Sequence, residues 1–116
     1  MMEPTPIHFV SFCKEVSVNN SVWTIHKDGQ ALAVADADGY NVMPFWSSRD
    51  RAVNFLNEVE EFEGFTPLEI PWVLFKTKWV PDLVEKKMGA GVNWTGGGIE
   101  CQADPEELVE GVRLHS

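Results

Sequence analysis

Basic residues are scarce in this sequence of 116 residues, which has nine Lys and Arg side chains against 18 Asp and Glu side chains. The formal net charge of -9 repels the phosphate backbone of nucleic acids, so we expect no nucleic-acid binding. The same charge would attract a basic protein partner, and it would equally serve to keep the protein soluble. The sequence leaves both explanations open.

Cysteine and long apolar runs are scarce as well. No apolar stretch approaches the length needed to span a membrane, and residues 1–7 show no positively charged segment followed by an apolar run. We therefore expect a cytoplasmic protein without membrane contact. In that compartment the two cysteines, Cys13 and Cys101, are expected to be reduced thiols.

Hydrophobic residues, by contrast, are plentiful, since they make up 44% of the chain and include five Trp and seven Phe. A compact chain of this length buries about two-thirds of the surface of its unfolded form, so it needs neither metal nor disulfide bonds to fold. The length leaves no room for two hydrophobic cores, and we predict one domain over residues 1–116. With so many aromatic residues, some could stay exposed for a partner.

The first half of the sequence predicts a helix followed by three strands. Residues 4–16 place apolar side chains at helical spacing, and the Asp-Gly pairs at 28–29 and 38–39 are typical of tight turns between strands. The strands are expected at 22–27, 31–35 and 41–46, as an antiparallel meander. Neither face of the middle strand is polar, so we expect that strand to be central and covered on both sides.

The second half predicts helices with short strands between them. Ser47 is a natural N-cap for a helix over residues 48–62, which Gly64 closes. Pro71 favours the first turn of a further helix, which Pro81 must end or kink. The remaining elements are expected as a strand at 66–70, a helical piece at 82–88, short strands at 92–94 and 99–102, and a last helix from 104 to about 113. The predicted fold class is α+β, with helices packed on a mainly antiparallel sheet.

Catalytic and metal-binding patterns are missing from the sequence. Nucleophilic catalysis needs a thiol or hydroxyl beside a base, but the histidines at positions 8, 26 and 115 form no recognised signature with the cysteines or serines. No His, Cys or carboxylate pair has zinc-site spacing, and Asp36 and Asp38 fit a hairpin turn better than a calcium loop. The glycines around position 90 lack the spacing of a dinucleotide fingerprint. We expect no cofactor, no metal and no catalytic residue, and we favour a protein that is not an enzyme.

One local group of residues could bind a ligand, at the point where the strand at 41–46 runs into the next helix. The free backbone N–H groups of a helix start attract an anion, and two arginines would reinforce that attraction. Trp94 would join the site if the fold brings it to the same pocket. The candidate ligand-binding residues are Trp46, Ser47, Ser48, Arg49, Arg51 and Trp94. The alternative is an ordinary helix start whose arginines are solvated and partner the surplus of carboxylates, and helix-start statistics favour it.

Several motifs follow one another in a distinctive order: Val22-Trp23-Thr24 opening a hairpin, Met43-Pro44-Phe45-Trp46-Ser47-Ser48 running into a helix, and Gly91-Val92-Asn93-Trp94 in a later strand. This order resembles the small bacterial family known as domain of unknown function 2750, and the spacing of Phe75, Trp79, Val80, Pro81 and Leu83 is similar to it too. The match covers most of the chain, whereas the long glycine turn after Trp94 departs from it. The resemblance implies no reaction, cofactor or catalytic residue.

Acidity and a surplus of aromatic residues, without catalytic machinery, favour a small cytosolic interaction module. We predict a regulatory or immunity-type role, with another protein or a second copy of the chain as partner. The alternative is a small-molecule or anion-binding protein, or an enzyme, with its site at residues 46–51 and Trp94. The two differ in their surfaces, because a partner needs a broad apolar patch and a ligand needs a concave pocket with a few aimed polar groups.

Overall fold

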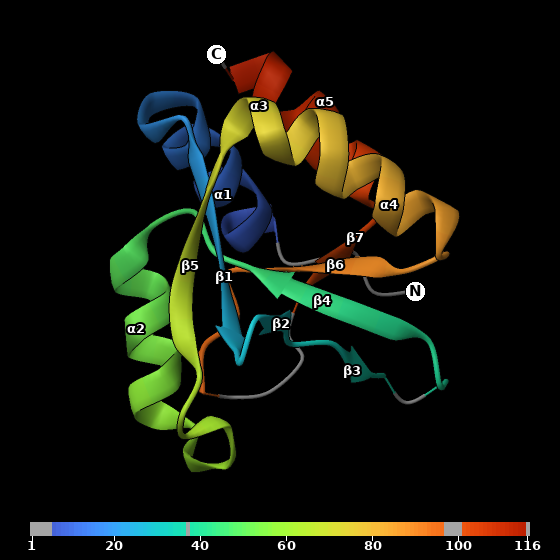
Figure 1. Ribbon diagram of the computed structural model, residues 1–116. Helices are drawn as coiled ribbons and strands as arrows, with labels where there is room; N and C mark the ends of the chain where they lie inside the picture. The colour runs from blue at the N-terminus through green and yellow to red at the C-terminus, as the bar shows by residue number, and fades with distance from the viewer. Residues whose placement is uncertain (1–5, 37, 97–100, 116) are drawn as a thin grey trace.

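Two small sheets meet near the middle of the molecule, and helices cover them (Figure 1). The structure is a computed structural model that describes residues 6–36, 38–96 and 101–115. One sheet has the order β2 (Gln30–Ala31), β1 (Ser21–Lys27), β5 (Thr66–Pro71), and the other has the order β3 (Val34–Ala35), β4 (Asn41–Phe45), β6 (Gly89–Val92), β7 (Gln102–Ala103). Strands β4 and β6 are parallel, and the other pairs are antiparallel. The predicted α+β class with a mainly antiparallel sheet is confirmed.

The helices enclose two hydrophobic cores, so the expectation that the chain has no room for two cores was wrong. The larger core lies between the sheets, α1 (Pro6–Asn19), α5 (Pro105–His115) and a bent helix built from α3 (Trp72–Leu74), η2 (Phe75–Trp79) and α4 (Val80–Glu85). The smaller core lies beneath α2 (Arg49–Glu58) and the short helix η1 (Glu60–Phe62). Side chains alternate along a strand, so the neighbours Phe45 and Trp46 serve the larger and the smaller core respectively. The radius of gyration of 13.0 Å is that of a compact chain.

The two sheets are joined by backbone hydrogen bonds between Trp23 and Trp46. Each residue donates its N–H to the other's carbonyl at 2.7 Å, just beyond the end of β4. Pro44 lies before this bridge, where β4 has already left β3, so its missing N–H breaks no pairing with that strand. The Thr24 hydroxyl donates to the Pro44 carbonyl at 2.8 Å and adds a second link between the sheets.

The predicted meander differs from the structure in its middle strand. Residues 30–31 pair with β1 and residues 34–35 pair with β4, so the expected strand at 31–35 is split between the two sheets. It is not central, and Ala33 and Ala35 are exposed. Strands β1 and β4 diverge from the Trp23–Trp46 bridge, and one strand cannot pair with both along its whole length.

The helix predicted over residues 48–62 is shorter than expected and starts one residue later, at Arg49. Ser48, not Ser47, is the N-cap, and its hydroxyl accepts the Arg51 backbone N–H at 3.3 Å. The α-helix ends at Glu58 because Val59 adopts an extended conformation, with φ -121° and ψ 98°, and η1 follows. Ser47 is buried instead, so the prediction that it caps the helix was wrong.

Pro81 does not end the bent helix, because the turn before it widens. The Val80 N–H donates to the Phe75 carbonyl, five residues back, in a π-helical turn over η2. Such a turn shifts the hydrogen-bonding register ahead of a residue that lacks an N–H. The Thr77 hydroxyl satisfies the Val73 carbonyl at 2.7 Å. The helix therefore continues from residue 72 to residue 85 as one bent rod.

Strands β5 and β6 carry residues that are unusual in strands. Strand β5 borders its sheet and contains Pro67 and Pro71, with the exposed Glu69 between them. Strand β6 lies at residues 89–92 rather than at the predicted 92–94, and it uses Gly91 to make room for Trp94, which folds back over it. A Cβ on Gly91 would lie 2.5 Å from the Trp94 ring. Half of the predicted strand at 99–102, residues 99 and 100, lies outside the described residues, and β7 begins at Gln102.

Candidate functional site

The predicted ligand site forms one closed hydrogen-bonded cluster, here called the α2 corner and defined by Glu15, Ser47, Arg51 and Asn93. Arg51 reaches from the first turn of α2 to Glu15 on α1, and its Nε and Nη2 donate to the two carboxylate oxygens at 2.9 and 2.6 Å. The Ser47 hydroxyl donates to the same carboxylate at 2.7 Å. A carboxylate of the chain itself therefore occupies the position that an anion would take beside Arg51.

Asn93 closes the α2 corner from the end of β6. Its side-chain carbonyl accepts the Ser47 backbone N–H at 3.0 Å, and its amide donates to the Ser47 hydroxyl at 3.1 Å. Ser47 and Asn93 are almost fully buried, so these bonds satisfy groups that water cannot reach. Asn93 has a φ of 49°, a left-handed conformation that Asn tolerates better than most residues.

The electrostatics of the α2 corner follow from the Arg51–Glu15 pair. The hydrogen bond from Arg51 lowers the pKa of Glu15 below its ordinary value of 4.5, and it outweighs the effect of partial burial. The same bond raises the pKa of Arg51. Both side chains keep more than a third of their surface in water, with exposed fractions of 39% and 34%, so solvent screens the attraction. Both groups are charged at neutral pH, and the pair links α1 to the start of α2.

The fold brings five of the six predicted site residues together and leaves Arg49 apart. The Trp46 indole N–H donates to the Trp94 carbonyl at 2.8 Å, which places both rings beside Ser47 and Arg51 at the α2 corner. Trp94 in turn donates its indole N–H to the Cys101 carbonyl at 2.8 Å. Ser48 is occupied as the N-cap of α2, and Arg49 lies on the exposed surface.

One small hollow borders the α2 corner, and a second lies next to it. The first has a volume of about 110 Å³ and is lined by Arg51, Asn54, Phe55, Glu58, Asn93, Trp94 and Thr95. The second has about 230 Å³ and lies along η1 and Val34. They share Phe55 and Trp94, so a small flat molecule could contact both rings while it approaches Arg51.

A larger depression runs between the bent helix and α5, and we call it the helix groove. Its near half has a volume of about 310 Å³ and is walled by Val16, Asn20, Trp72, Val112 and Arg113. Its far half has about 540 Å³ and is walled by Val80, Pro81, Val84, Glu85, Glu106 and Glu110. Lys76 and Val109 line both halves, so the two hollows form one continuous groove.

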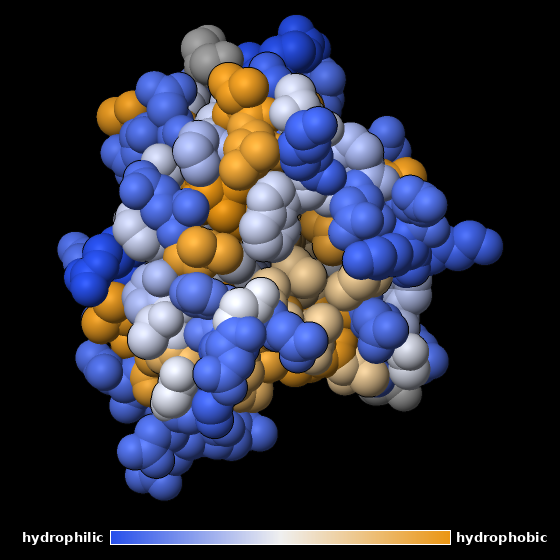
Figure 2. Space-filling model, viewed as in Figure 1, coloured by the Kyte–Doolittle hydropathy of each residue, from blue (hydrophilic) through white to orange (hydrophobic). Residues whose placement is uncertain are grey.

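Among the described residues, four of the seven exposed large apolar side chains belong to the two helices that form the helix groove, and the others are Ile7, Val18 and Tyr40. Val73 is 66% exposed, Leu74 and Val84 are 42% exposed, and Leu114 is 66% exposed. Figure 2 shows apolar side chains gathered over the upper part of the molecule, where α3 and the end of α5 lie in Figure 1. A surface of this kind on the helices beside a groove is typical of an interaction site.

The match to a family model covers residues 9–111 of the chain, and that family is described as a protein of unknown function, DUF2750. The chain belongs to the DUF2750 family. A comparison with curated proteins finds no match. The resemblance drawn from the sequence motifs is therefore confirmed over nearly the whole chain.

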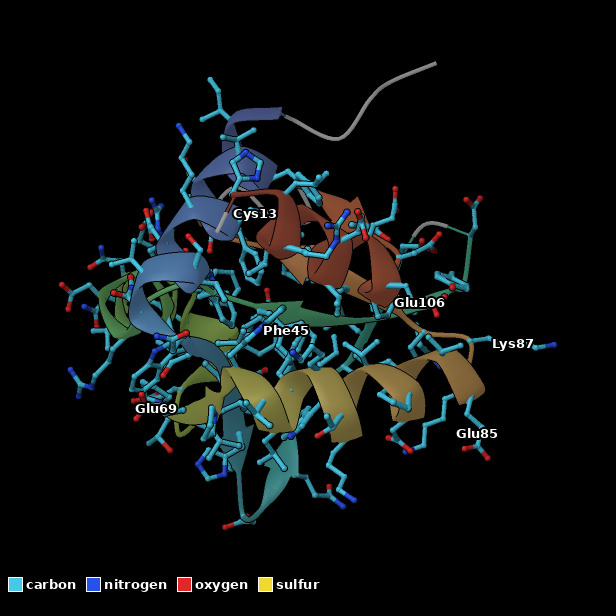
Figure 3. The ribbon with its side chains drawn as sticks, turned by 90° about the horizontal axis from the view of Figure 1, so that it is seen from above. Cys13, Phe45, Glu69, Glu85, Lys87 and Glu106 are labelled. Carbon is cyan, nitrogen blue, oxygen red and sulfur yellow. The ribbon has the colours of Figure 1, made fainter. Side chains whose placement is uncertain are left out.

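The motifs that carry the DUF2750 resemblance are mainly determinants of its fold. Pro44 lies beside the junction of the sheets, and the Phe45 ring packs edge-on against Phe75 at 5.0 Å and Trp79 at 6.2 Å between ring centres. Figure 3 shows Phe45 between the layer of α1 and α5 and the bent helix. These residues hold the bent helix on β4 and thereby set the position of the helix groove.

The aromatic residues of this DUF2750 protein do not supply an exposed patch. All five Trp and all seven Phe are buried or half-buried, and the exposed apolar side chains beside the helix groove are aliphatic. The sequence contains an indication of these exposed aliphatic side chains. Val73, Leu74 and Val84 lie outside the stripe formed by Trp72, Phe75 and Trp79, so the bent helix has a second apolar face.

The nucleophile candidates are held in unreactive surroundings. Cys13 is fully buried in the larger core, and burial raises its pKa to about 11, so the thiol stays protonated at neutral pH. His8 lies with its Nδ1 3.1 Å from the Asn93 carbonyl. Over residues 6–36, 38–96 and 101–115, no three His, Cys, Asp or Glu side chains gather in a way that could hold a metal ion, and no helix is long and apolar enough to cross a membrane.

Proposed function

We propose that this DUF2750 protein is an interaction module that binds another protein through the helix groove. The observation that supports this best is the continuity of the two hollows between the bent helix and α5, with apolar walls and exposed aliphatic side chains on the helices beside them. Exposing such side chains brings a free monomer no folding benefit, whereas a partner would remove them from water. The proposed module acts by binding in the cytoplasm.

Within this proposal, the module has a regulatory or immunity-type role, which the same arrangement supports. A module of this kind works by covering part of its partner, and it needs a preformed rigid surface rather than reactive groups. The groove walls are helices anchored in the larger core by Phe75, Leu83 and Leu108, all of which are almost fully buried. The surface is thus preorganised, which lowers the entropic cost of binding.

Native mass spectrometry on the protein isolated gently from the cells that produce it tests this proposal. We expect a heavier complex that contains a second protein, and we expect Val84→Asp to remove it by placing a charge on the groove wall. Ile7→Asp is the matched control, because Ile7 is 74% exposed at the start of α1, away from the groove. A bare chain, or a complex that survives Val84→Asp, would contradict the proposal.

A second candidate function is small-molecule or anion binding at the α2 corner. It is favoured by the two hollows that meet at Trp94 and Phe55 beside Arg51. An anion at this place must compete with Glu15 for Arg51, so neutralising that carboxylate should release the arginine for a ligand.

Titration with inorganic phosphate, monitored by calorimetry, shows whether the α2 corner binds an anion or has only a structural role. Glu15→Gln should strengthen phosphate binding, and Arg51→Ala should weaken it by removing the cation that lines the smaller hollow. Glu60→Gln on η1 is the matched control for the loss of one negative charge. Equal binding by Glu15→Gln and Glu60→Gln would rule out the α2 corner as the anion site.

A further inference from the structure

The far half of the helix groove combines apolar walls with a surplus of carboxylates. Val80, Pro81, Val84 and Val109 supply the apolar surface. Around them stand Glu85 on α4 and Glu106 and Glu110 on α5, with Lys76 as the cation that lines this half. The near half differs in charge, because it is lined by Lys76 and Arg113. The groove therefore becomes more negative from its near half to its far half.

Two of these carboxylates have no cation of their own. Glu110 pairs with Arg113, and the neighbouring Lys86 pairs with Asp82 at 3.0 Å. Within the part of the chain that the structure describes, Glu85 and Glu106 have no ion-pair partner. Figure 3 shows them on the two sides of this half, at the end of α4 and the start of α5, while Lys87 extends outward past the end of α4.

The helix dipole acts in opposite directions on the charges of Glu106 and Glu85. Glu106 lies in the first turn of α5, where the helix dipole stabilises a negative charge. Glu85 is the last residue of α4, where the same effect disfavours a negative charge and a cation would be favourable. A cation beside Glu85 would correct the unfavourable position of that carboxylate, and a second cation could pair with Glu106 on the opposite wall.

We propose that the far half of the helix groove binds a cationic amphipathic helix of a partner protein, an inference that rests on the interaction function proposed above. The partner's apolar face would lie on Val80, Val84 and Val109, and Lys or Arg side chains at its margin would pair with Glu85 and Glu106. A second copy of the chain fits this surface poorly, because each copy carries a net charge of -9. An anionic membrane is repelled for the same reason.

Two synthetic peptides of about 18 residues, long enough for five helical turns, serve as probes. They share the same Leu-rich face and differ only in a Lys-rich or a Glu-rich polar face. We expect the full-length protein to bind the Lys peptide in a saturable 1:1 complex that shifts the amide resonances of Val84 and Val109. Binding of the Glu peptide should be at least tenfold weaker.

Paired charge reversals locate the binding. We expect Glu85→Lys/Glu106→Lys to weaken Lys-peptide binding at least tenfold, and the neutral Glu85→Gln/Glu106→Gln pair to weaken it to a lesser degree. Glu60→Lys/Glu61→Lys changes the net charge of the protein equally on exposed residues of η1, and it should alter the affinity less than twofold. All four glutamates are exposed, so these variants should fold, which circular dichroism checks.

Other outcomes would overturn this inference. If both charge-reversed pairs lose the same affinity for the Lys peptide, the peptide responds to net charge alone. If the amide resonances that shift lie only on other surfaces, the peptide binds outside the groove. Stronger binding to vesicles of anionic lipid than to the peptide would favour a membrane. If the Glu peptide binds the groove as well as the Lys peptide does, the cationic partner is wrong although the interaction module stands. Persistence of the native complex in Val84→Asp defeats the module itself.

Discussion

Individual residues decide how the α2 corner behaves, and Glu15 is the central one. Its carboxylate accepts hydrogen bonds from Arg51 and from the buried Ser47, so α1 and the start of α2, which are distant in sequence, are joined by one ionised group. Because the pair is partly exposed, we expect its removal to cost about 1 kcal/mol rather than the larger penalty of a fully buried ion pair.

The stability of the protein should depend on pH through the ionisation of Glu15. The folded-state pKa of Glu15 is depressed, so its contribution is fully present above the ordinary value of 4.5 and is lost as pH falls through the folded-state pKa. We expect the difference in unfolding free energy between wild type and Glu15→Gln to be constant from pH 7 to pH 5, and to shrink below about pH 4.5. Urea unfolding at a series of pH values measures it. A difference that grows on acidification would refute the assignment.

Gly91 is a second residue whose identity the structure fixes. A Cβ there would meet the Trp94 ring at 2.5 Å, whereas a Cβ on Gly89 would meet the half-exposed Tyr40 ring at 3.1 Å. We expect Gly91→Ala to destabilise the protein by about 2 kcal/mol, because the indole must leave its place against the strand. Gly89→Ala is the control, and it should cost under about 1 kcal/mol because Tyr40 can turn away. Equal costs, measured by urea unfolding, would contradict this account.

At the scale of the elements, the contact between α1 and α5 depends on a close approach. A Cβ on Gly111 would lie 2.6 Å from the Cys13 sulfur and 2.8 Å from the Phe9 ring. The two helices can therefore touch only because α5 lacks a side chain at this point. This explains a glycine in the middle of a helix, where it would otherwise cost about 1 kcal/mol relative to Ala.

We therefore expect Gly111→Ala to destabilise the protein, by about 1–2 kcal/mol, although it raises helix propensity. Cys13→Ala removes the sulfur that the new methyl group would strike. The double variant should thus be more stable than the sum of the two single changes predicts, by about 0.5 kcal/mol or more. Thermal or urea unfolding of all four proteins measures this coupling. Strict additivity would show that Cys13 is not what limits the approach.

The elements also show what could be predicted from the sequence. Hydrophobic periodicity and turn residues located α1, β1, β4, β5 and α5, because each of these depends on neighbours close in sequence. The split of the middle strand followed from the divergence of β1 and β4, which no local pattern records. Pro81 was expected to end or kink its helix; it does not end it, because the π-helical turn before it shifts the hydrogen-bonding register, which no local pattern records.

The candidate site was predictable only in part, for the same reason. The sequence placed Trp46, Ser47 and Arg51 together because they are neighbours in the chain. It could not supply Glu15 or Asn93, which reach Ser47 from 32 and 46 residues away. The helix groove lies between helices that are distant in sequence, so the pattern within one segment could not predict it.

The whole molecule should unfold as one cooperative unit. The backbone bridge between Trp23 and Trp46 ties the sheets together, and Phe45 and Trp46 place one strand in both cores. We expect the urea transitions followed by tryptophan fluorescence and by far-UV circular dichroism to coincide, as predicted for a single domain. The amides of Trp23 and Trp46 should be among the slowest to exchange with solvent. Two separated transitions would show that the cores fold independently.

Strand β5 runs along the border of its sheet for six residues, and a border of that length could accept a strand from another molecule. Pro67 and Pro71 remove two N–H donors from it, and Glu69 places a charge between them. Chains that open partly, during synthesis or on heating, would find no continuous row of donors along this border. The backbone of β5 thus resists amyloid-like growth, and contacts between molecules are left to side chains, which can discriminate one partner from another.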